Sequence, residues 1–131
     1  MADAVDVKVV YSGKRRYTVH MTNISDGTGE SGVTKVDISA LTGFPFTPTA
    51  TTIDLIEYNV QGFTSVRLYW DHTTDDEIAV LGTGAGIIDW GAYGGNMDPR
   101  TTGGTGDIIL TTAGTTSGNT YDITLHLRPK A

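Results

Sequence analysis

Apolar and polar positions alternate in steps of two through residues 119–128. The apolar phase consists of Tyr121, Ile123, Leu125 and Leu127, and the polar phase of Asp122, Thr124, His126 and Arg128. This period is that of a β-strand with one face in the core and the other in solvent. Residues 106–113 form a second strand candidate, and the Thr, Ser, Gly and Asn residues at 114–119 predict the turn of a hairpin between the two.

The first part of the chain shows the same alternation. Residues 4–11 and 17–22 are strand candidates, and the short turn at 12–14 predicts that they pair as a hairpin. The polar run at 23–32 has few apolar side chains that burial could order, so we expect an exposed, mobile loop there.

A third, short strand is predicted at residues 33–39. Its inward positions are Val36 and Ile38, and its outward positions are Lys35 and Asp37. The next segment, residues 40–50, carries two prolines and cannot be a central strand, because proline donates no hydrogen bond to the ladder. We expect a long crossover between two sheets, with Phe44 and Phe46 packed against the sandwich, as in Greek-key folds.

Large apolar side chains occur on both phases of residues 51–71, which we interpret as a hairpin about a Gln61-Gly62 turn. One face holds Ile53, Leu55, Val66, Leu68 and Trp70. The other face holds Ile56, Tyr58, Val60, Phe63, Arg67 and Tyr69. A strand with two apolar faces is either central or covered on one face by another chain, so we predict that the second set is a protein interface. A register slip of one residue would exchange the faces and place half of these rings in the core.

Residues 77–81 and 87–90 are two further short strand candidates. The segment at 91–106 is rich in glycine and too long for a tight turn, and loops of such length are usually functional or disordered. We therefore predict a docking or ligand-binding loop here. Its candidate contact residues are Trp90, Tyr93, Asn96 and Met97.

These segments predict roughly eight antiparallel strands and no helix, because no stretch keeps an apolar stripe of helical period. With a long proline-containing crossover, the best-matching architecture is an all-β, two-sheet antiparallel sandwich of the jelly-roll type. We expect a single β-sandwich domain over residues 1–131. An immunoglobulin-like sandwich is the alternative, although its Cys and Trp landmarks are absent.

Composition narrows the function classes. The chain has 131 residues, enough for one buried core, and no cysteine, so it has neither disulfides nor a thiolate site. Its formal net charge of −6 and pI near 4.7 argue against a surface that neutralises nucleic-acid phosphates. The N-terminal segment has no continuous apolar run, so we expect neither a signal peptide nor a membrane span.

The sequence offers no convincing catalytic or metal-binding motif. His20, His72 and His126 lack the spacing of a metal site, and no nucleophile turn is present. The GTGAG run at 82–86 lacks the Lys-Ser/Thr pair of a phosphate-binding loop and precedes no helix. We therefore expect no enzymatic activity, no catalytic residue, no metal and no cofactor.

The cysteine-free strands rich in Thr and Gly, and the closing pair GDIILTT and TYDITLHLR, resemble small structural proteins of tailed bacteriophages. In particular, the chain is similar to the jelly-roll capsid decoration, or cement, proteins. This resemblance implies a non-enzymatic virion protein that is assembled in the host cytoplasm. Such a protein binds the major capsid protein on the outer capsid surface and stabilises the capsid lattice, often as a homotrimer. We expect its self-contacts to come from the interface set on residues 51–71.

A carbohydrate-binding or lectin-like sandwich is the alternative function. Its candidate stacking rings are Tyr69, Trp90 and Tyr93, and its candidate hydroxyl-binding groups are Asp89 and Asn96. Tyrosine and tryptophan suit this role because they present an apolar face together with a polar group. A small enzyme is a third class, but no set of residues in the sequence favours it.

Overall fold

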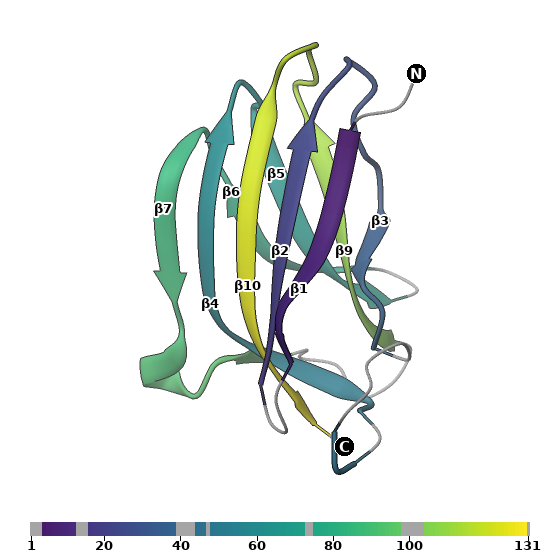
Figure 1. The fold of residues 1–131 in the computed structure, drawn as a ribbon, viewed down its shortest axis with the longest axis vertical. Helices are drawn as coiled ribbons and strands as arrows, with labels where there is room; N and C mark the ends of the chain where they lie inside the picture. Colours follow the sequence, from purple (N-terminus) through teal and green to yellow (C-terminus); the bar gives the residue numbers. More distant parts are fainter. Residues whose placement is uncertain are drawn as a thin grey trace.

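Two antiparallel sheets packed face to face make up the protein (Figure 1). The structure is a computed structural model, and it describes residues 4–12, 16–38, 44–46, 48–72, 75–97 and 104–130. The six-stranded sheet has the order β1 (Ala4–Ser12), β2 (Tyr17–Ile24), β10 (Thr120–Lys130), β4 (Ala50–Gln61) and β7 (Gly84–Asp89), and β8 (Asn96–Met97) also pairs with β4. The four-stranded sheet has the order β3 (Val33–Val36), β9 (Gly104–Ala113), β5 (Ser65–His72) and β6 (Asp76–Leu81).

The strand pairings are nested. β2 pairs with β10, β3 with β9, β4 with β7 and β5 with β6, so the first half of the chain runs antiparallel to the second half. A chain paired in this way and wrapped into two sheets is a jelly roll. The predicted fold class, an all-β antiparallel jelly-roll sandwich, is therefore confirmed. The immunoglobulin-like alternative does not have this pairing.

The core lies between the sheets and is built from the inward phase of each long strand. On β10 the inward positions are Tyr121, Ile123, Leu125 and Leu127, each at most 2% exposed. The smaller sheet contributes Leu68, Trp70, Ile108 and Leu110, also almost fully buried. Burying one such side chain stabilises the fold by about 1.5–3 kcal/mol. The inward face predicted for residues 119–128 is confirmed.

The two closing strands do not pair with each other, so the hairpin predicted from residues 106–113 and 119–128 is wrong. β9 lies between β3 and β5 in the smaller sheet, whereas β10 lies between β2 and β4 in the larger one. The turn between them crosses from one sheet to the other. Periodicity specifies which face of each strand is apolar, and two such faces are buried better against each other across a sandwich than side by side in one sheet.

β4 and β5 also belong to different sheets, so the hairpin predicted over residues 51–71 is wrong. A β-bulge at Asp54 explains why β4 has two apolar phases, because the register on β10 shifts at this point. One extra residue exchanges the two faces of a strand. Ile53 therefore faces the core before the bulge, and Ile56 and Val60 face it afterwards.

The N-terminal hairpin is confirmed, since β1 pairs with β2. Of the turn predicted at residues 12–14, residues 13 and 14 lie outside the described residues. The third strand is confirmed as β3, but the outward position predicted for Lys35 is wrong. Lys35 is 7% exposed and Val36 is 2% exposed, because a register shift between Thr34 and Val36 turns two consecutive residues inward.

The segment predicted as an exposed loop, residues 23–32, is exposed only in part. Asn23, Ser25 and Glu30 are all at least nine-tenths buried. Of the predicted crossover, residues 39–43 and 47 lie outside the described part, but the ring of Phe44 contacts that of Tyr17 at a centroid distance of 6.2 Å. Within the described ranges, no helix is long and apolar enough to cross a bilayer.

Candidate functional site

The six residues predicted as a protein interface divide between the core and the surface. Ile56, Val60 and Phe63 are buried in the core, and Tyr58 packs against it. Arg67 and Tyr69 instead lie on the outer side of the smaller sheet. They cannot form one face because they come from strands in opposite sheets. The predicted self-association face is therefore wrong. The register assumption behind it required β4 and β5 to be neighbours.

The docking loop predicted at residues 91–106 begins after β7 with the short 3₁₀ turn η2 (Gly91–Tyr93) and β8 (Figure 1). Its residues 98–103 lie outside the described residues, and residues 104–106 belong to β9. Tyr93 is 84% exposed and Met97 is 52% exposed. Trp90, by contrast, packs against the core, and the backbone of Asn96 pairs with β4. We call residues 91–97 the end loop. Of the four predicted contact residues, Tyr93 and Met97 face solvent, whereas Trp90 and Asn96 attach the loop to the sandwich.

Arg128, on the polar phase of β10, fixes the end loop to the sheet. Its Nε donates a hydrogen bond to Asp54 Oδ2 at 2.7 Å, and its Nη2 donates to the backbone oxygen of Gly94 at 2.7 Å. The backbone amide of Trp90 donates to Asp54 O at 2.8 Å. This hydrogen bond to the Asp54 carboxylate raises the pKa of the Arg128 guanidinium. The loop is thus held by side-chain and backbone contacts before any partner binds.

A hollow of about 400 Å³ lies between the end loop and the end of β10. Its lining residues are Phe46, Thr52, Gly94, Met97, Arg128, Pro129 and Lys130. It combines apolar side chains with two cationic groups, in a protein that is acidic as a whole. The hollow beside the end loop therefore has a lining of mixed apolar and basic character.

The outer face of the six-stranded sheet carries polar side chains in rows across the strands. The strand register gives one row as Asp6, Thr22, Asp122 and Asn59, and the next as Lys8, His20, Thr124 and Glu57. Hydroxyl, amide and carboxylate groups in such rows can donate and accept hydrogen bonds from a polar ligand. This face is chemically distinct from the end loop.

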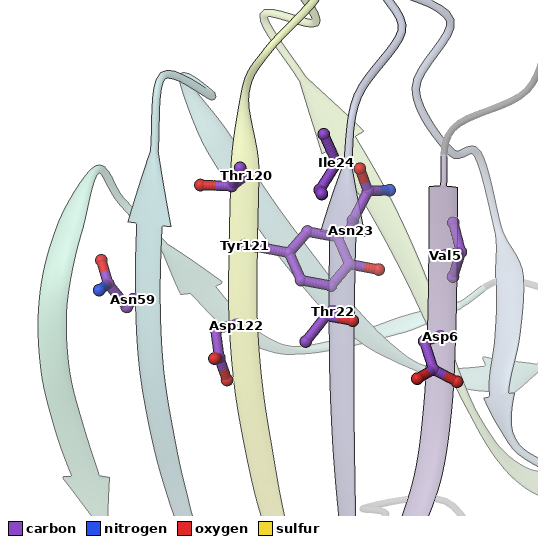
Figure 2. Close-up of a pocket in the computed structure, with 9 residues that line it drawn as sticks. All are labelled: Val5, Asp6, Thr22, Asn23, Ile24, Asn59, Thr120, Tyr121 and Asp122. Atoms are coloured by element: carbon purple, nitrogen blue, oxygen red, sulfur yellow. The ribbon is translucent and has the colours of Figure 1, made fainter.

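A hollow of about 640 Å³ lies at one end of this face, where four strands run side by side (Figure 2). Its lining residues are Val5, Asp6, Thr22, Asn23, Ile24, Asn59, Thr120, Tyr121 and Asp122. A second hollow of about 470 Å³ shares Asn59 and Asp122 with it and extends toward β7. The two hollows therefore adjoin, and their shared groups are polar.

Two histidines on this outer face each contact one carboxylate. His20 Nε2 lies 2.5 Å from Asp122 Oδ1, and His126 Nε2 lies 2.7 Å from Glu57 Oε1. In the part of the chain that the structure describes, no group of three or more His, Cys, Asp or Glu side chains converges on a point. The side chain of His72 lies outside that part. Exposed pairs of this kind contribute about 0–1 kcal/mol to stability.

A buried polar cluster links the two sheets, and the sequence analysis did not find it. Glu30 Oε2 lies 2.5 Å from Lys35 Nζ. Glu30 Oε1 accepts hydrogen bonds from Tyr121 Oη at 2.5 Å and from Asn23 Nδ2 at 2.8 Å. Lys35 belongs to the smaller sheet, whereas Tyr121 and Asn23 belong to the larger one. The cluster ties the segment after β2 to both layers and is a structural element.

The residues predicted to bind sugar do not lie on one platform. Tyr69 is on β5 in the smaller sheet, whereas Trp90 follows β7 of the larger sheet and packs against the core. Asp89 Oδ1 accepts a hydrogen bond from the backbone amide of Gly91 at 2.8 Å, so it shapes the turn into η2. The polar groups that do lie together are those of the outer-face hollows.

No known family model matches the chain, and no curated protein matches its sequence. Similar folds occur among solved structures. A cupin domain from Bordetella pertussis Tohama I covers 100% of this chain and 98% of its own, with 8% identity and a TM-score of 0.42. The CBM22-1-GH10 modules of the xylanase Xyn10B from Clostridium thermocellum match 98% of this chain and 25% of their own, with 11% identity and a TM-score of 0.49.

Hydroxypropylphosphonic acid epoxidase from S. wedmorenis is also similar, with 12% identity and a TM-score of 0.36 over 92% of this chain. The chain spans about half the length of that protein, 49%. Likenesses of this size concern the fold, and they carry no inference about what the chain binds or does.

Proposed function

We propose that the protein is a non-enzymatic capsid decoration protein, which binds the outside of a tailed-phage head through its end loop and stabilises the lattice. The observation that carries this proposal is Tyr93, an aromatic side chain 84% exposed on an anchored loop. Tyrosine is enriched among the few residues that dominate the binding energy of protein interfaces. Exposing such a side chain to water has no structural benefit for the isolated protein.

The anchoring of the loop supports the same proposal. A loop that is already ordered loses little conformational entropy on binding, so more of its contact energy appears as affinity. The bonds from Arg128 to Asp54 and to Gly94 supply this order. A jelly roll whose interior is filled by side chains leaves its function to loops and outer faces.

In this proposal the major capsid protein is the partner, and the protein is added to the outer capsid surface in the host cytoplasm. Nucleic acid and membranes play no part. A homotrimer remains our prediction for the form assembled on the capsid surface, and not for the free protein in solution, because several end loops presented together would bind adjacent capsid subunits with avidity. Self-contacts must then come from residues other than the buried set on β4.

Co-sedimentation with phage heads tests the proposal. Heads of the phage that encodes the chain, prepared without this protein, are mixed with purified protein and pelleted. We expect saturable binding, and we expect Tyr93→Ala to weaken it by roughly 30-fold, as for an interface residue worth about 2 kcal/mol. Met97→Ala should weaken it by a smaller factor.

The control is Val80→Ala, which truncates an apolar side chain on β6 of the other sheet whose exposure, 51%, is close to the 52% of Met97. We expect this variant to bind as the wild type does. Heads that do not bind the protein at all would contradict the proposal. Equal binding by the wild type and Tyr93→Ala would exclude the end loop as the contact surface.

A carbohydrate-binding role is the second candidate, and the polar hollow of about 640 Å³ favours it. Thr22, Asn59 and Asp122 line this hollow and offer the hydroxyl, amide and carboxylate groups that bind sugar hydroxyls. A glycan array tests this role. Binding that is lost in Asn59→Ala and kept in Tyr93→Ala would support it, and an array without signal would contradict it.

A further inference from the structure

β1 is an edge strand of the six-stranded sheet, and the described residues cover its inner face only in part. The register on β2 places Val5, Val7 and Val9 on the same side as Met21 and Val19. Those two β2 residues are buried, at 0% and 2% exposed, whereas the three valines are 42%, 41% and 52% exposed. In Figure 1, β1 is the outermost strand of its sheet, beside β2, and β9 and β3 of the smaller sheet lie behind it. The smaller sheet thus leaves the three valines partly exposed.

The uncovered valines adjoin a hollow of about 210 Å³ between β1 and the edge of the smaller sheet. Its lining residues are Val7, Val9, Tyr17, Val19, Lys35, Val36 and Asp37. A long strand with free backbone groups and an apolar row is a template for pairing with another strand. Proteins usually protect such an edge with inward charges, bulges or a covering element. Along Val5 to Val9 the inward positions are apolar, and the one register shift of β1 on β2 falls after Val9.

The outward positions of β1 carry opposite charges two residues apart. Asp6 Oδ2 lies 3.2 Å from Lys8 Nζ, and the two side chains are 54% and 72% exposed. The sequence around Val7 is therefore self-complementary. If two copies of β1 pair antiparallel about a two-fold axis at Val7, Asp6 of each lies opposite Lys8 of the other.

The same register organises the apolar row. Val7 lies opposite Val7 of the second copy, and Val5 lies opposite Val9. Side chains directly opposite each other on antiparallel strands contact one another, and opposite charges or β-branched pairs in these positions are favourable. An isologous contact of this kind closes after two copies and does not propagate.

We propose that a second copy of this chain covers the β1 edge, through antiparallel β1 pairing centred on Val7. The charges on β1 favour a second copy over another partner. The chain carries a net charge of −6, so two copies repel overall, and the Asp6 and Lys8 pairs neutralise the contact locally. A register shifted by one or two residues leaves Asp6 opposite an apolar or like-charged residue. The inference does not depend on the capsid role.

Charge exchange tests the register in the full-length protein. Sedimentation equilibrium should give a concentration-dependent dimer for the wild type. Asp6→Lys places lysine opposite lysine and Lys8→Asp places aspartate opposite aspartate, so each should weaken dimerisation by about 10- to 30-fold. An equimolar mixture of the two variants should form a heterodimer with restored affinity, because each lysine then faces an aspartate.

The matched control uses the exposed pair Arg67 and Glu77 on the smaller sheet, whose Nε and Oε1 atoms are 3.9 Å apart. Arg67→Glu and Glu77→Lys change charge to the same extent, and neither should alter the dimer. A wild type that is monomeric throughout, a trimeric mass, or single variants that dimerise normally would each overturn the proposal.

A cysteine on the two-fold axis gives an independent readout, since the chain has no cysteine of its own. Residues opposite each other in an antiparallel pair have Cα atoms about 4.5–5.5 Å apart, which is within the range that a disulfide closes. Oxidised Val7→Cys should therefore run as a covalent dimer. Val80→Cys, on the edge strand β6, is the control and should stay monomeric. Equal cross-linking of both variants, or of neither, would overturn the proposed register.

Discussion

Glu30 and Lys35 form an ion pair inside the protein. Their Oε2 and Nζ atoms are 2.5 Å apart, and the side chains are only 5% and 1% exposed. The second carboxylate oxygen of Glu30 is held by Tyr121 and Asn23. Each buried charge has a large desolvation penalty, which is offset only by its attraction to the opposite charge beside it. The pair therefore favours the one arrangement of the segment after β2 in which Glu30 contacts Lys35.

Lys35→Met tests this dependence. Removing the ammonium leaves the Glu30 carboxylate buried without its counter-charge, so we expect a loss of about 3–5 kcal/mol in the free energy of unfolding. The double variant Glu30→Gln/Lys35→Met should lose less than the sum of the two single changes. Urea unfolding provides the measurement, with Arg67→Met in an exposed pair as a control that changes stability by less than about 0.5 kcal/mol. Similar losses for Lys35→Met and Arg67→Met would contradict the buried pair.

Gly95→Ala should destabilise the end loop. Gly95 has a φ of +92°, and a Cβ there would lie 2.2 Å from the Thr52 side chain and 2.9 Å from Asp54 Oδ1. We expect a loss of more than about 1 kcal/mol in urea unfolding. Gly82→Ala is the control, because Gly82 has no positive φ and no atom within 4 Å of its Cβ position. Its stability should be unchanged or slightly higher.

Arg128→Ala should loosen the end loop without unfolding the sandwich. The change removes the bonds to Asp54 and to the Gly94 backbone, while β10 keeps its core-facing side chains. The amide of Gly95, which donates to Trp90 O at 2.9 Å, reports the loop. We expect its hydrogen exchange to become about tenfold faster, as for the loss of roughly 1.4 kcal/mol of local stability. Unchanged exchange at Gly95 would show that Arg128 does not anchor the loop.

Because of Tyr17, we expect the free energy of unfolding to depend on pH in the alkaline range. Burial raises the pKa of its hydroxyl above the ordinary value of 10.0 in the folded protein. Above pH 10 the unfolded chain loses this proton before the folded protein does, so the Tyr17 contribution to stability is complete below pH 10 and falls as pH rises further. Tyr17→Phe should therefore lose stability less steeply than the wild type above pH 10. Identical slopes in urea unfolding would contradict the prediction.

Much of the strand content could be predicted from the sequence, because a two-residue period is a local property. The alternation of Tyr121, Ile123, Leu125 and Leu127 specifies both a strand and its buried face. Pairing is not local. Neither the closing strands nor β4 and β5 are neighbours in a sheet, since the jelly roll joins each pair across the sandwich. Short polar turns look the same whether they close a hairpin or cross between sheets.

The same limit applies to the candidate site. The exposure of Tyr93 and Met97 could be anticipated, because bulky side chains in a glycine-rich loop have little core to join. The inward position of Lys35 could not, because a register shift in β3 reverses the expected phase. The bulge at Asp54 likewise exchanged the faces of β4. A bulge inserts one residue without a sequence signature. Alternation therefore assigns the residues beyond a bulge to the wrong face of the strand.

Cryo-electron microscopy of phage heads, with and without the added protein, tests the decoration role most directly. If the protein decorates the capsid, we expect difference density of jelly-roll size on the outer surface only. The end loop should face the capsid shell, with Tyr93 in the contact. Heads mixed with Tyr93→Ala should show weaker density at the same positions, and heads mixed with Val80→Ala should match the wild type. Absence of outer density, or density inside the shell, would contradict the account.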